Sequence, residues 1–278
     1  APPGRVERGG PAPLREASAP VLKKRRPGRF LPGVSIQGSH EPTIASEAGG
    51  LPAGGTDSRA AELYLDLLKK ILTGLIRPQL YAPAEPPANP VKRAVFRRLQ
   101  STLRARGKEI VWRVPFDPNV RTQGIDWPVE AETMVGLPRL ENVQRCIEDV
   151  LRRGVPGDLI ETGVWRGGTC IFMRACLEAY GDRERTVWLA DSFQGLPPPN
   201  PDKYPADAGD LHSTWKELAV SRAEVEENFR RYGLLDERVR FLEGWFRDTL
   251  PSAPVERLAV LRLDGDMYES TMDALTAL

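Results

Sequence analysis

Two carboxylates that follow one apolar run are the residues of this sequence best suited to chemistry. Asp264 and Asp266 stand in the segment LRLDGDMYEST, separated by a single glycine. Carboxylates at the end of an apolar strand are costly unless they bind a cation or carry a proton. Because Mg²⁺ prefers oxygen ligands, Asp264 is a candidate magnesium ligand. A pair of solvated loop acids is the alternative interpretation.

A glycine-rich stretch, ETGVWRGGT, connects a predicted strand to a predicted helix. Gly163 permits a tight turn, and Gly167 and Gly168 let the chain pass close to a ligand. The spacing differs from the GxGxxG of dinucleotide-binding turns. Glu161 would repel a pyrophosphate but could orient a cofactor that carries a cationic or amine group. A purely structural turn between strand and helix is the alternative interpretation.

Asp191 ends the apolar run TVWLAD, the next predicted strand along the chain. In open α/β sheets, ligands lie outside the carboxyl ends of the strands, so the residues just after each strand matter most. A carboxylate at this position can accept hydrogen bonds from both hydroxyls of a ribose. The glycine-rich turn and Asp191 together predict a bound nucleoside cofactor.

The elements that would position these residues begin after Gly154, where short apolar runs alternate with helical stretches. The predicted strands cover 158–162, 186–190, 239–242 and 258–263, and the predicted helices cover 169–180 and 221–232. Short strands that alternate with helices indicate βαβ units. We therefore predict a doubly wound, Rossmann-like α/β domain with a mostly parallel sheet over residues 131–278.

Residues 58–130 are predicted to form N-terminal helices and a linker that act as a lid, a substrate-binding region or a dimer region. Helical spacing over 60–76 places four apolar side chains on one face: Leu63, Leu67, Ile71 and Leu75. A strongly basic helix over 91–106 follows a Pro-rich linker. A further helix over 133–153 presents four apolar side chains on one side: Leu140, Val143, Ile147 and Val150.

Both ends of the chain differ in character from the predicted domain. Residues 1–57 contain nine Pro and ten Gly and almost no apolar periodicity. Such a segment buries too little surface to offset its ordering entropy, so we predict a disordered tail. The chain opens on Ala1 and closes at Leu278 within a helix-forming stretch. We therefore expect a fragment whose domain is truncated at its C-terminal side.

The composition argues against several classes of protein. Lys and Arg number 39 against 38 Asp and Glu, and this balance argues against a dedicated nucleic-acid binder. No window approaches the ~18 to 20 apolar residues of a membrane-spanning helix, so no membrane partner is expected. The cysteines Cys146, Cys170 and Cys176 lack disulfide or zinc spacing and are predicted to be small buried side chains. Together with the lack of a secretory signal, they indicate a reducing cytoplasm.

The stretch from Leu63 to Leu278 resembles the macrocin O-methyltransferase (TylF-like) family, whose members methylate sugar hydroxyls or phenols of antibiotics with S-adenosylmethionine and Mg²⁺. The matching segments are LYLDLLKKILTGLI, GIDWPVEAETMVGLPRLENVQ, DLIETGVWRGGT, WLADSFQGLP, VRFLEGWFRDTLP and LRLDGDMYESTMDAL. Six segments in the same order argue against chance similarity. The resemblance implies a class I methyltransferase fold and a small-molecule hydroxyl acceptor, either a glycosylated natural product or a phenol.

The resemblance also implies how the cofactor would be bound. Glu161 and the loop from Gly163 to Gly168 would hold the aminoacyl end of S-adenosylmethionine. Asp191 and Ser192 would bind its ribose. Four further residues would border the cofactor: Thr133, Met134, Gly244 and Trp245.

For catalysis, the resemblance implies that Asp264 is a metal ligand and Asp266 the general base, with the remaining metal ligands beyond Leu278. Two alternatives stay open. A nicotinamide-dependent oxidoreductase shares the fold class but would need GxGxxG and a hydride-transfer acid. A non-catalytic binding protein could keep the fold. A homo-oligomer is also considered, because the helix over 60–76 could pack on a partner subunit.

Overall fold

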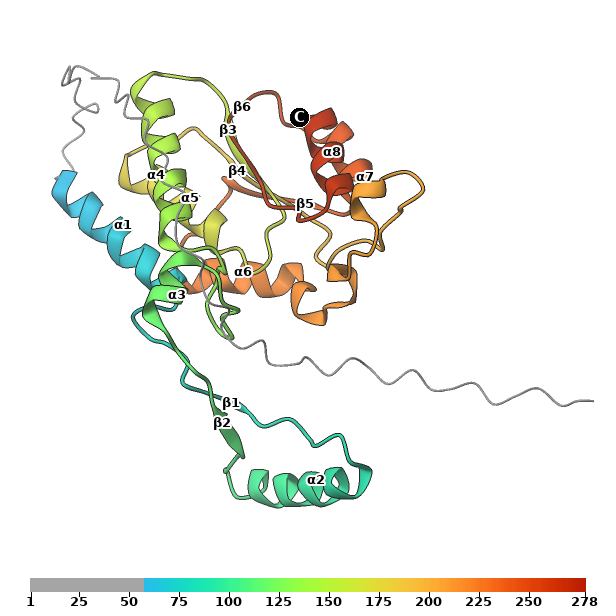
Figure 1. Cartoon of the computed structure of the whole chain (residues 1–278). Helices are drawn as coiled ribbons and strands as arrows, with labels where there is room; N and C mark the ends of the chain where they lie inside the picture. The colour runs from blue at the N-terminus through green and yellow to red at the C-terminus, as the bar shows by residue number, and fades with distance from the viewer. Residues whose placement is uncertain (1–57) are drawn as a thin grey trace, which may run out of the picture. The chain divides into compact units, whose positions relative to one another are not determined.

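The structure, a computed structural model, describes residues 58–278, so the predicted tail over 1–57 lies outside the described residues. A four-stranded sheet forms the centre of the domain (Figure 1). Its strands are β3 (Asp158–Thr162), β4 (Val187–Asp191), β5 (Val239–Glu243) and β6 (Leu258–Leu263). They are all parallel and lie in the order β5-β4-β3-β6. The predicted α/β fold with a parallel sheet is confirmed.

Helices cover both faces of this sheet, as Figure 1 shows. Those beyond the N-terminal region are α4 (Leu137–Arg152), α5 (Gly168–Ala179), α6 (Arg222–Arg231), α7 (Phe246–Thr249) and α8 (Tyr268–Ala277). Because side chains alternate along a strand, Leu159 and Ile160 enter different cores. The first core packs β3 and β4 against α1, α4, α5 and α6, and the second packs them against α8 and the segment before β6.

Helix α4 shows where a helical pattern overstates the length of a helix. Its predicted apolar side, Leu140, Val143, Ile147 and Val150, is buried. The helix nevertheless begins at Leu137 instead of Thr133, with Gly136 as an extended N-cap and a proline in the first turn. The four residues before it run as irregular chain, where the Thr133 N–H donates to the carbonyl of Leu72 at 3.2 Å.

Helix α1 (Ser58–Leu72) is present as predicted, but a second apolar row, not the one noted in the sequence, packs into the domain. The buried side chains are Leu65, Leu68 and Leu72, which pack into the first core. The predicted row faces outward: Leu63, Leu67 and Ile71 are 63%, 50% and 40% exposed. Both rows have helical spacing, so periodicity alone could not tell which of them meets the sheet layer.

The segment between α1 and α4 holds elements that the sequence pattern did not predict. Strands β1 (Tyr81–Pro83) and β2 (Val111–Arg113) pair antiparallel, one inside the predicted Pro-rich linker and the other after the predicted basic helix. A short helix, α3 (Pro118–Gln123), begins at an Asp117 N-cap. Three-residue strands carry too little periodicity to be recognised.

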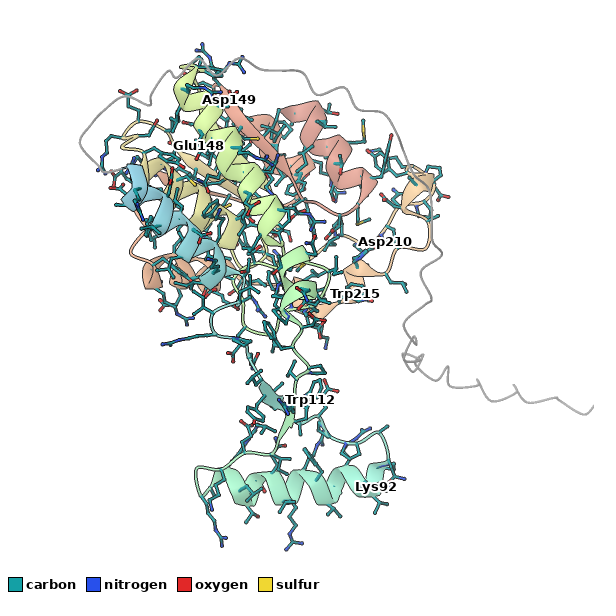
Figure 2. All side chains as sticks on the ribbon, turned by 60° about the vertical axis from the view of Figure 1, so that its left-hand side comes forward. Lys92, Trp112, Glu148, Asp149, Asp210 and Trp215 are labelled. Atoms are coloured by element: carbon teal, nitrogen blue, oxygen red, sulfur yellow. The ribbon has the colours of Figure 1, made fainter. Side chains whose placement is uncertain are left out.

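Helix α2 (Pro90–Arg104) matches the predicted basic helix and is carried by the β1–β2 ribbon. In Figures 1 and 2 it lies at the end of the ribbon away from the parallel sheet. Asn89 caps it, since its side-chain oxygen accepts N–H bonds from Val91 and Lys92 at 3.0 and 3.1 Å. No residue of Pro90–Arg104 is buried.

Two of the three cysteines lie where the sequence predicts. Cys170 and Cys176 are fully buried in α5, whereas Cys146 on α4 is exposed, so its predicted burial is wrong. Cys146 lies beside the core row of α4, on a side of the helix that lines a cavity, a position that residue type alone does not reveal. Between Ser58 and Leu278 no helix combines the length and apolar character needed to span a bilayer.

Candidate active site

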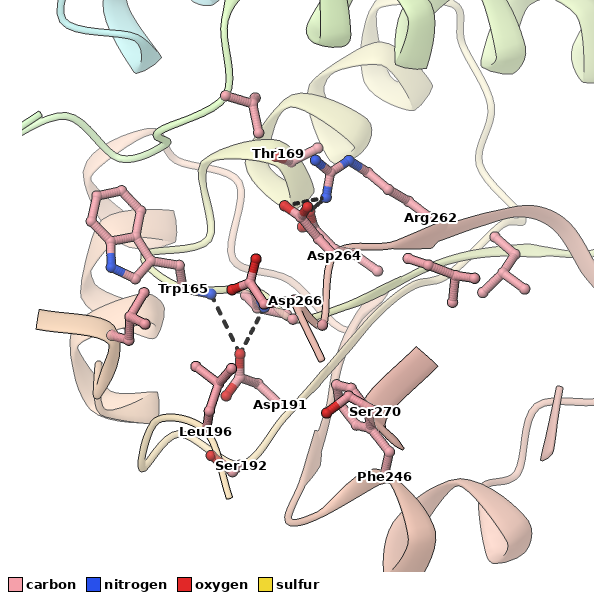
Figure 3. Close-up of a pocket in the computed structure, with 18 of the residues that line it drawn as sticks. Trp165, Thr169, Asp191, Ser192, Leu196, Phe246, Arg262, Asp264, Asp266 and Ser270 are labelled. Atoms are coloured by element: carbon pink, nitrogen blue, oxygen red, sulfur yellow. Dashed lines mark hydrogen bonds and ion pairs between the residues drawn. The ribbon is translucent and has the colours of Figure 1, made fainter. Parts of the chain in front are cut away.

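A cavity of about 690 Å³ opens at the carboxyl ends of the four parallel strands (Figure 3). Its volume lies within the ~300 to 1,000 Å³ typical of small-molecule sites. Ten of the predicted site residues line it: Thr133, Met134, Glu161, Gly163, Asp191, Ser192, Gly244, Trp245, Asp264 and Asp266. Residues from four strand ends and from the chain before α4 therefore meet in one crevice, where an open α/β sheet binds its ligand.

Gly163 allows the ends of β3 and β6 to approach each other. Its φ is +89°, and a Cβ atom there would lie 2.2 Å from the carbonyl oxygen of Asp264. The Asp264 N–H donates to the carbonyl of Thr162 at 2.8 Å, which holds the two strand ends in register. Only glycine fits this position, so the glycine-rich turn lies directly against the acidic end of β6.

Gly167 and Gly168 do not line the cavity. A Cβ atom on Gly167, whose φ is +85°, would lie 2.7 Å from the Val225 side chain. One on Gly168 would lie 2.6 Å from the backbone of Glu132. These two glycines let α5 start close to α6 and to the chain before α4. They therefore support the glycine-rich turn on the side away from the cavity.

Asp191 fastens the glycine-rich turn to β4. Its Oδ2 accepts the Val164 N–H at 2.7 Å and the Trp165 N–H at 3.4 Å (Figure 3). Its Oδ1 accepts the Phe193 N–H at 2.8 Å. Burial raises the pKa of Asp191, and these N–H donors oppose the shift. A carboxylate offers about four acceptor positions, so room for a hydroxyl donor remains.

Glu161 lies at the base of the cavity and is 1% exposed. Its Oε1 contacts the Arg262 guanidinium at 2.5 Å, and the Cys170 thiol donates to its Oε2 at 2.8 Å. Burial raises the pKa of Glu161 to about 7, with Arg262 opposing and Asp264 reinforcing the shift. A carboxyl group whose pKa lies near 7 can ionise when a cationic group of a ligand binds beside it.

Arg262 is a site residue that the sequence analysis missed. The same Nη1 that contacts Glu161 lies 2.8 Å from Oδ2 of Asp264 (Figure 3). One guanidinium therefore bridges the acids at the ends of β3 and β6. A cation within an apolar strand, in LRLD, was the available signal, because a buried cation needs an acidic partner.

Asp266 projects into the cavity from a left-handed backbone conformation, with φ +59°. Few residues other than glycine, Asn and Asp adopt this conformation, and such outliers gather at functional sites. The side chain reaches solvent, yet partial desolvation and the neighbouring Asp264 raise its pKa, while His212 lowers it. A carboxylate with a raised pKa is a better proton acceptor.

The chain before α4 is held by a buried arginine that the sequence analysis also missed. Arg121 on α3 donates from Nη2 to the carbonyls of Met134 and Val135. Its Nη1 lies 3.1 Å from Oδ1 of Asp126. Thr133, 4% exposed, accepts the Val135 N–H at 3.2 Å. The predicted cofactor-flanking residues thus stand on a segment fixed by α3.

The remaining predicted residues form turns on the β4 and β5 sides. Ser192 donates from Oγ to the Gly195 carbonyl at 2.6 Å and closes a tight turn after β4. The Gly244 N–H donates to the Asp191 carbonyl at 2.9 Å, which joins the ends of β4 and β5. Trp245 follows as the N-cap of α7 and presents its side chain at the cavity.

An aromatic cluster beside the cavity was not predicted as a unit. Trp127 makes edge contacts with Trp165 and Trp215, at centroid distances of 6.3 and 5.9 Å. The His212 ring lies 4.5 Å from Trp215, and its Nδ1 pairs with Oδ2 of Asp210 at 2.8 Å. Figure 2 shows Asp210 and Trp215 together on this side of the domain. Trp165 lines the cavity itself, so the cluster is in contact with the cavity wall.

The acidic residues at the end of β6 do not by themselves form a metal site. Across the described range 58–278, no group of three or more His, Cys, Asp or Glu side chains is arranged to hold a metal ion. Asp264 is paired with Arg262, and Asp266 adds one more carboxylate. The described residues therefore supply an incomplete ligand set for Mg²⁺.

A match to a protein-family model shows which family the chain belongs to. The model described as macrocin-O-methyltransferase (TylF) matches residues 61–278, which include every residue of the cavity. This chain belongs to the macrocin O-methyltransferase family. It is an O-methyltransferase, as the sequence analysis predicted.

Relatives of this chain agree with the family model. Demethyldecarbamoylnovobiocin O-methyltransferase of Streptomyces niveus is 51% identical over 222 residues, covering 78% of this chain and 75% of the relative. A rhamnosyl-tetracenomycin-C 4'-O-methyltransferase of Streptomyces olivaceus is 52% identical over 217 residues, covering 78% and 74%. Mycinamicin III 3''-O-methyltransferase of Micromonospora griseorubida is 49% identical over 222 residues, covering 79% and 78%.

A solved structure supports the fold of this family member. The O-methyltransferase NovP superposes with a TM-score of 0.64 at 49% sequence identity, covering 78% of each chain. The strand-end cavity therefore belongs to a methyltransferase fold.

Proposed function

We propose that this chain transfers the methyl group of S-adenosylmethionine to a hydroxyl group of a sugar or phenol in a natural product. The observation that carries the proposal is the meeting of Glu161, Asp191 and Asp266 in one cavity at adjacent strand ends. Each acid has a separate use there: one faces a cationic group, one a ribose, and one a hydroxyl proton.

The residues present fit S-adenosylmethionine as the methyl donor. Glu161 would neutralise the α-amino group, because its carboxyl is buried and has a pKa near neutral pH. Asp191 would accept a ribose hydroxyl with the lone pairs that its three N–H donors leave free. Trp245 and Met134 supply apolar walls for the adenine.

When bound, this cofactor supplies an electrophilic methyl group on a sulfonium centre. Asp266 would accept the proton of the acceptor hydroxyl as the oxygen attacks the methyl carbon, and the electron pair of the breaking carbon–sulfur bond remains on sulfur. The rigid strand ends hold acceptor and donor in line, and positioning of this kind accounts for much of the rate of methyl transfer. The raised pKa of Asp266 suits it to this proton transfer.

Mg²⁺ assistance is kept as an expectation of the family resemblance only. Asp264 is the residue that would contribute a ligand, but its pairing with Arg262 and the incomplete set within the described residues do not support a metal centre.

The acceptor would enter past the aromatic cluster. Flat aromatic side chains such as Trp165 and Trp127 suit the apolar faces of a sugar or phenol ring, and the His212–Asp210 pair adds polar contacts. Relatives are named for methylation of a novobiocin precursor, a rhamnosyl-tetracenomycin and mycinamicin III. A glycosylated or phenolic natural product is the acceptor class we propose.

Calorimetry with two pairs of ligands tests the cofactor. S-adenosylmethionine should bind and NAD should not, and the opposite result would overturn the methyltransferase proposal in favour of an oxidoreductase.

S-adenosylhomocysteine should also bind more tightly than its 2′,3′-dideoxy analogue. That preference should disappear in Asp191→Asn, whereas Asp149→Asn on the exposed side of α4 should keep it. An equal preference in both variants would exclude Asp191 as the ribose ligand.

A further inference from the structure

Helix α8 begins directly after the proposed proton acceptor and has no cap of its own. Met267, which follows Asp266, takes the N-cap position with an extended backbone, and its side chain makes no capping hydrogen bond. The first N–H groups of an α-helix have no partner inside the helix, so another group has to accept them. A distant part of the chain supplies that group here.

Asp207 caps α8 from 61 positions earlier in the chain. Its Oδ1 accepts the Tyr268 N–H at 2.7 Å, and its Oδ2 accepts the Glu269 N–H at 2.9 Å. Asp207 is 5% exposed, and a buried carboxylate is costly unless hydrogen bonds compensate it. The helix dipole also favours an anionic acceptor at a helix N-terminus. Asp207 therefore fixes the point at which α8 begins.

The segment that carries Asp207 runs between β4 and α6, and Asp207 ends its short 3₁₀ turn, Pro205–Asp207. The Asp207 N–H donates to the carbonyl of Tyr204 at 3.0 Å, and the Asp210 N–H donates to the carbonyl of Asp207 at 3.1 Å. The rings of Tyr204 and Tyr268 lie 6.0 Å apart. The segment then continues into the aromatic cluster, so Asp207 joins the proposed acceptor side of the cavity to the start of α8.

The turn between β6 and α8 sets the position of Asp266. Asp266 has a φ of +59° and lines the cavity (Figure 3), whereas Asp207 does not line it. The Met267 N–H donates to the carbonyl of Gly265 at 2.6 Å, which tightens the turn around Asp266. A left-handed residue other than glycine persists only where its surroundings fix it. Strand β6 fixes this turn before Asp266, and the bonds to Asp207 fix it two residues after.

We propose that Asp207 is a positioning residue, which holds the turn at Asp266 in the conformation that directs the Asp266 carboxylate at the acceptor hydroxyl. This inference rests on the role of Asp266 in the proposed reaction. Asp207 would act without touching the cofactor or the acceptor. A purely structural cap would stabilise α8 and leave the reaction unaffected, so the two roles predict different results.

Amide hydrogen exchange of the full chain, followed by nuclear magnetic resonance, tests the turn without turnover. In Asp207→Ala the Tyr268 and Glu269 N–H groups lose their acceptors and should exchange about 10-fold faster, the effect of one hydrogen bond. The Met267 N–H belongs to the turn itself and should also exchange faster, because the turn is no longer held. Faster exchange at Tyr268 and Glu269 with unchanged exchange at Met267 would show a cap that does not hold the turn, and would overturn the proposal.

Asp182→Ala is the matched control. Asp182 also accepts two backbone N–H bonds, from Glu184 and Arg185 at 3.1 and 2.9 Å, but it precedes β4, at the end of the sheet away from the cavity. This variant should lose stability in urea, as Asp207→Ala does, and should leave exchange at Met267 and turnover unchanged. Asp207→Asn keeps one acceptor oxygen and should fall between the wild type and Asp207→Ala, so it carries the test if the alanine variant unfolds.

Methylation kinetics, with demethyldecarbamoylnovobiocin as the acceptor probe, separate positioning from folding. In Asp207→Ala kcat should fall by about 10-fold or more, because small misplacements of a reacting group are costly. The Kd of S-adenosylmethionine and the KM of the acceptor should stay nearly unchanged. In an Asp266→Asn background the same substitution should cost nothing further, because its effect passes through Asp266. An equal loss in both backgrounds, or an unchanged kcat, would overturn the proposal.

The two measurements distinguish a failure of this proposal from a failure of the proposed reaction. Full activity of Asp266→Asn would count against the proposed reaction, and with it against any positioning role. Unchanged exchange at Met267 in Asp207→Ala would count against Asp207 alone, because exchange requires neither cofactor nor turnover.

Discussion

At the scale of single residues, Asp266 is the group whose chemistry the proposed reaction most requires. Asp266→Asn keeps the shape but cannot accept the hydroxyl proton. We expect turnover to fall by about 10²-fold or more, the usual contribution of a general base, with S-adenosylmethionine affinity nearly unchanged. Methylation kinetics and calorimetry measure the two effects, and Asp149→Asn is the matched control on the exposed side of α4. Full activity of Asp266→Asn would remove Asp266 from the mechanism.

Glu161 makes cofactor binding depend on pH. Because its pKa is raised to about 7, a fraction of the carboxyl is protonated near neutrality, and a cationic amine favours the ionised form. Affinity for S-adenosylmethionine should rise between pH 6 and 8, with protons released on binding near pH 7. Calorimetry in buffers of different ionisation enthalpy detects the release. Proton uptake, or the same release in Glu161→Gln, would contradict the assignment.

The same carboxyl affects the stability of the ligand-free protein with a definite sign. Its pKa rises from an ordinary 4.5 in the unfolded chain to about 7 in the folded one, so the folded state binds more protons between these values. The free energy of unfolding should fall as pH rises through this window. Glu161→Gln cannot ionise and should show a shallower fall in urea titrations at pH 5 and pH 8. An equal slope would mean that Arg262 compensates the ionised carboxyl fully.

At the scale of elements, the glycine-rich turn depends on the close approach of β3 and β6. Gly163→Ala combines a strained φ of +89° with a Cβ 2.2 Å from the Asp264 carbonyl oxygen. Gly209→Ala is the matched control, because its φ is +81° and nothing lies within 4 Å of the added atom. The control should cost about 1 kcal/mol and Gly163→Ala clearly more, measured by urea unfolding. Equal costs would show that the strand ends can separate freely.

At the scale of the whole molecule, one cavity connects all four parallel strand ends, so its ligand should stabilise the fold. S-adenosylmethionine at about 100 times its Kd should add about 2.7 kcal/mol to the free energy of unfolding. For a domain of this size that corresponds to a rise in Tm of about 5 to 11 °C. A thermal scan with NAD at the same concentration is the control. An equal shift with NAD would mean that the cavity does not discriminate between the two cofactors.

The predictions that succeeded rest on sequence patterns that are short and contiguous. Apolar runs that end in an acid or glycine, as at Glu161, Asp191 and Asp264, reveal strand ends, and parallel strands place those ends at one edge. The family motifs were equally readable, because they are contiguous. The fold class and the ten cavity residues were therefore accessible from the sequence alone.

Only the tertiary structure could show what depends on contacts between distant segments. The bridge from Arg262 to Glu161 joins residues 101 positions apart. The helical pattern of α1 contains two apolar rows, and only packing against α5 and α4 selects Leu65 over Leu67 as the buried one. Local sequence thus determined the four parallel strands, the longer helices and the chemistry at the strand ends. Burial and pairing were decided by the fold, because they depend on which surfaces meet.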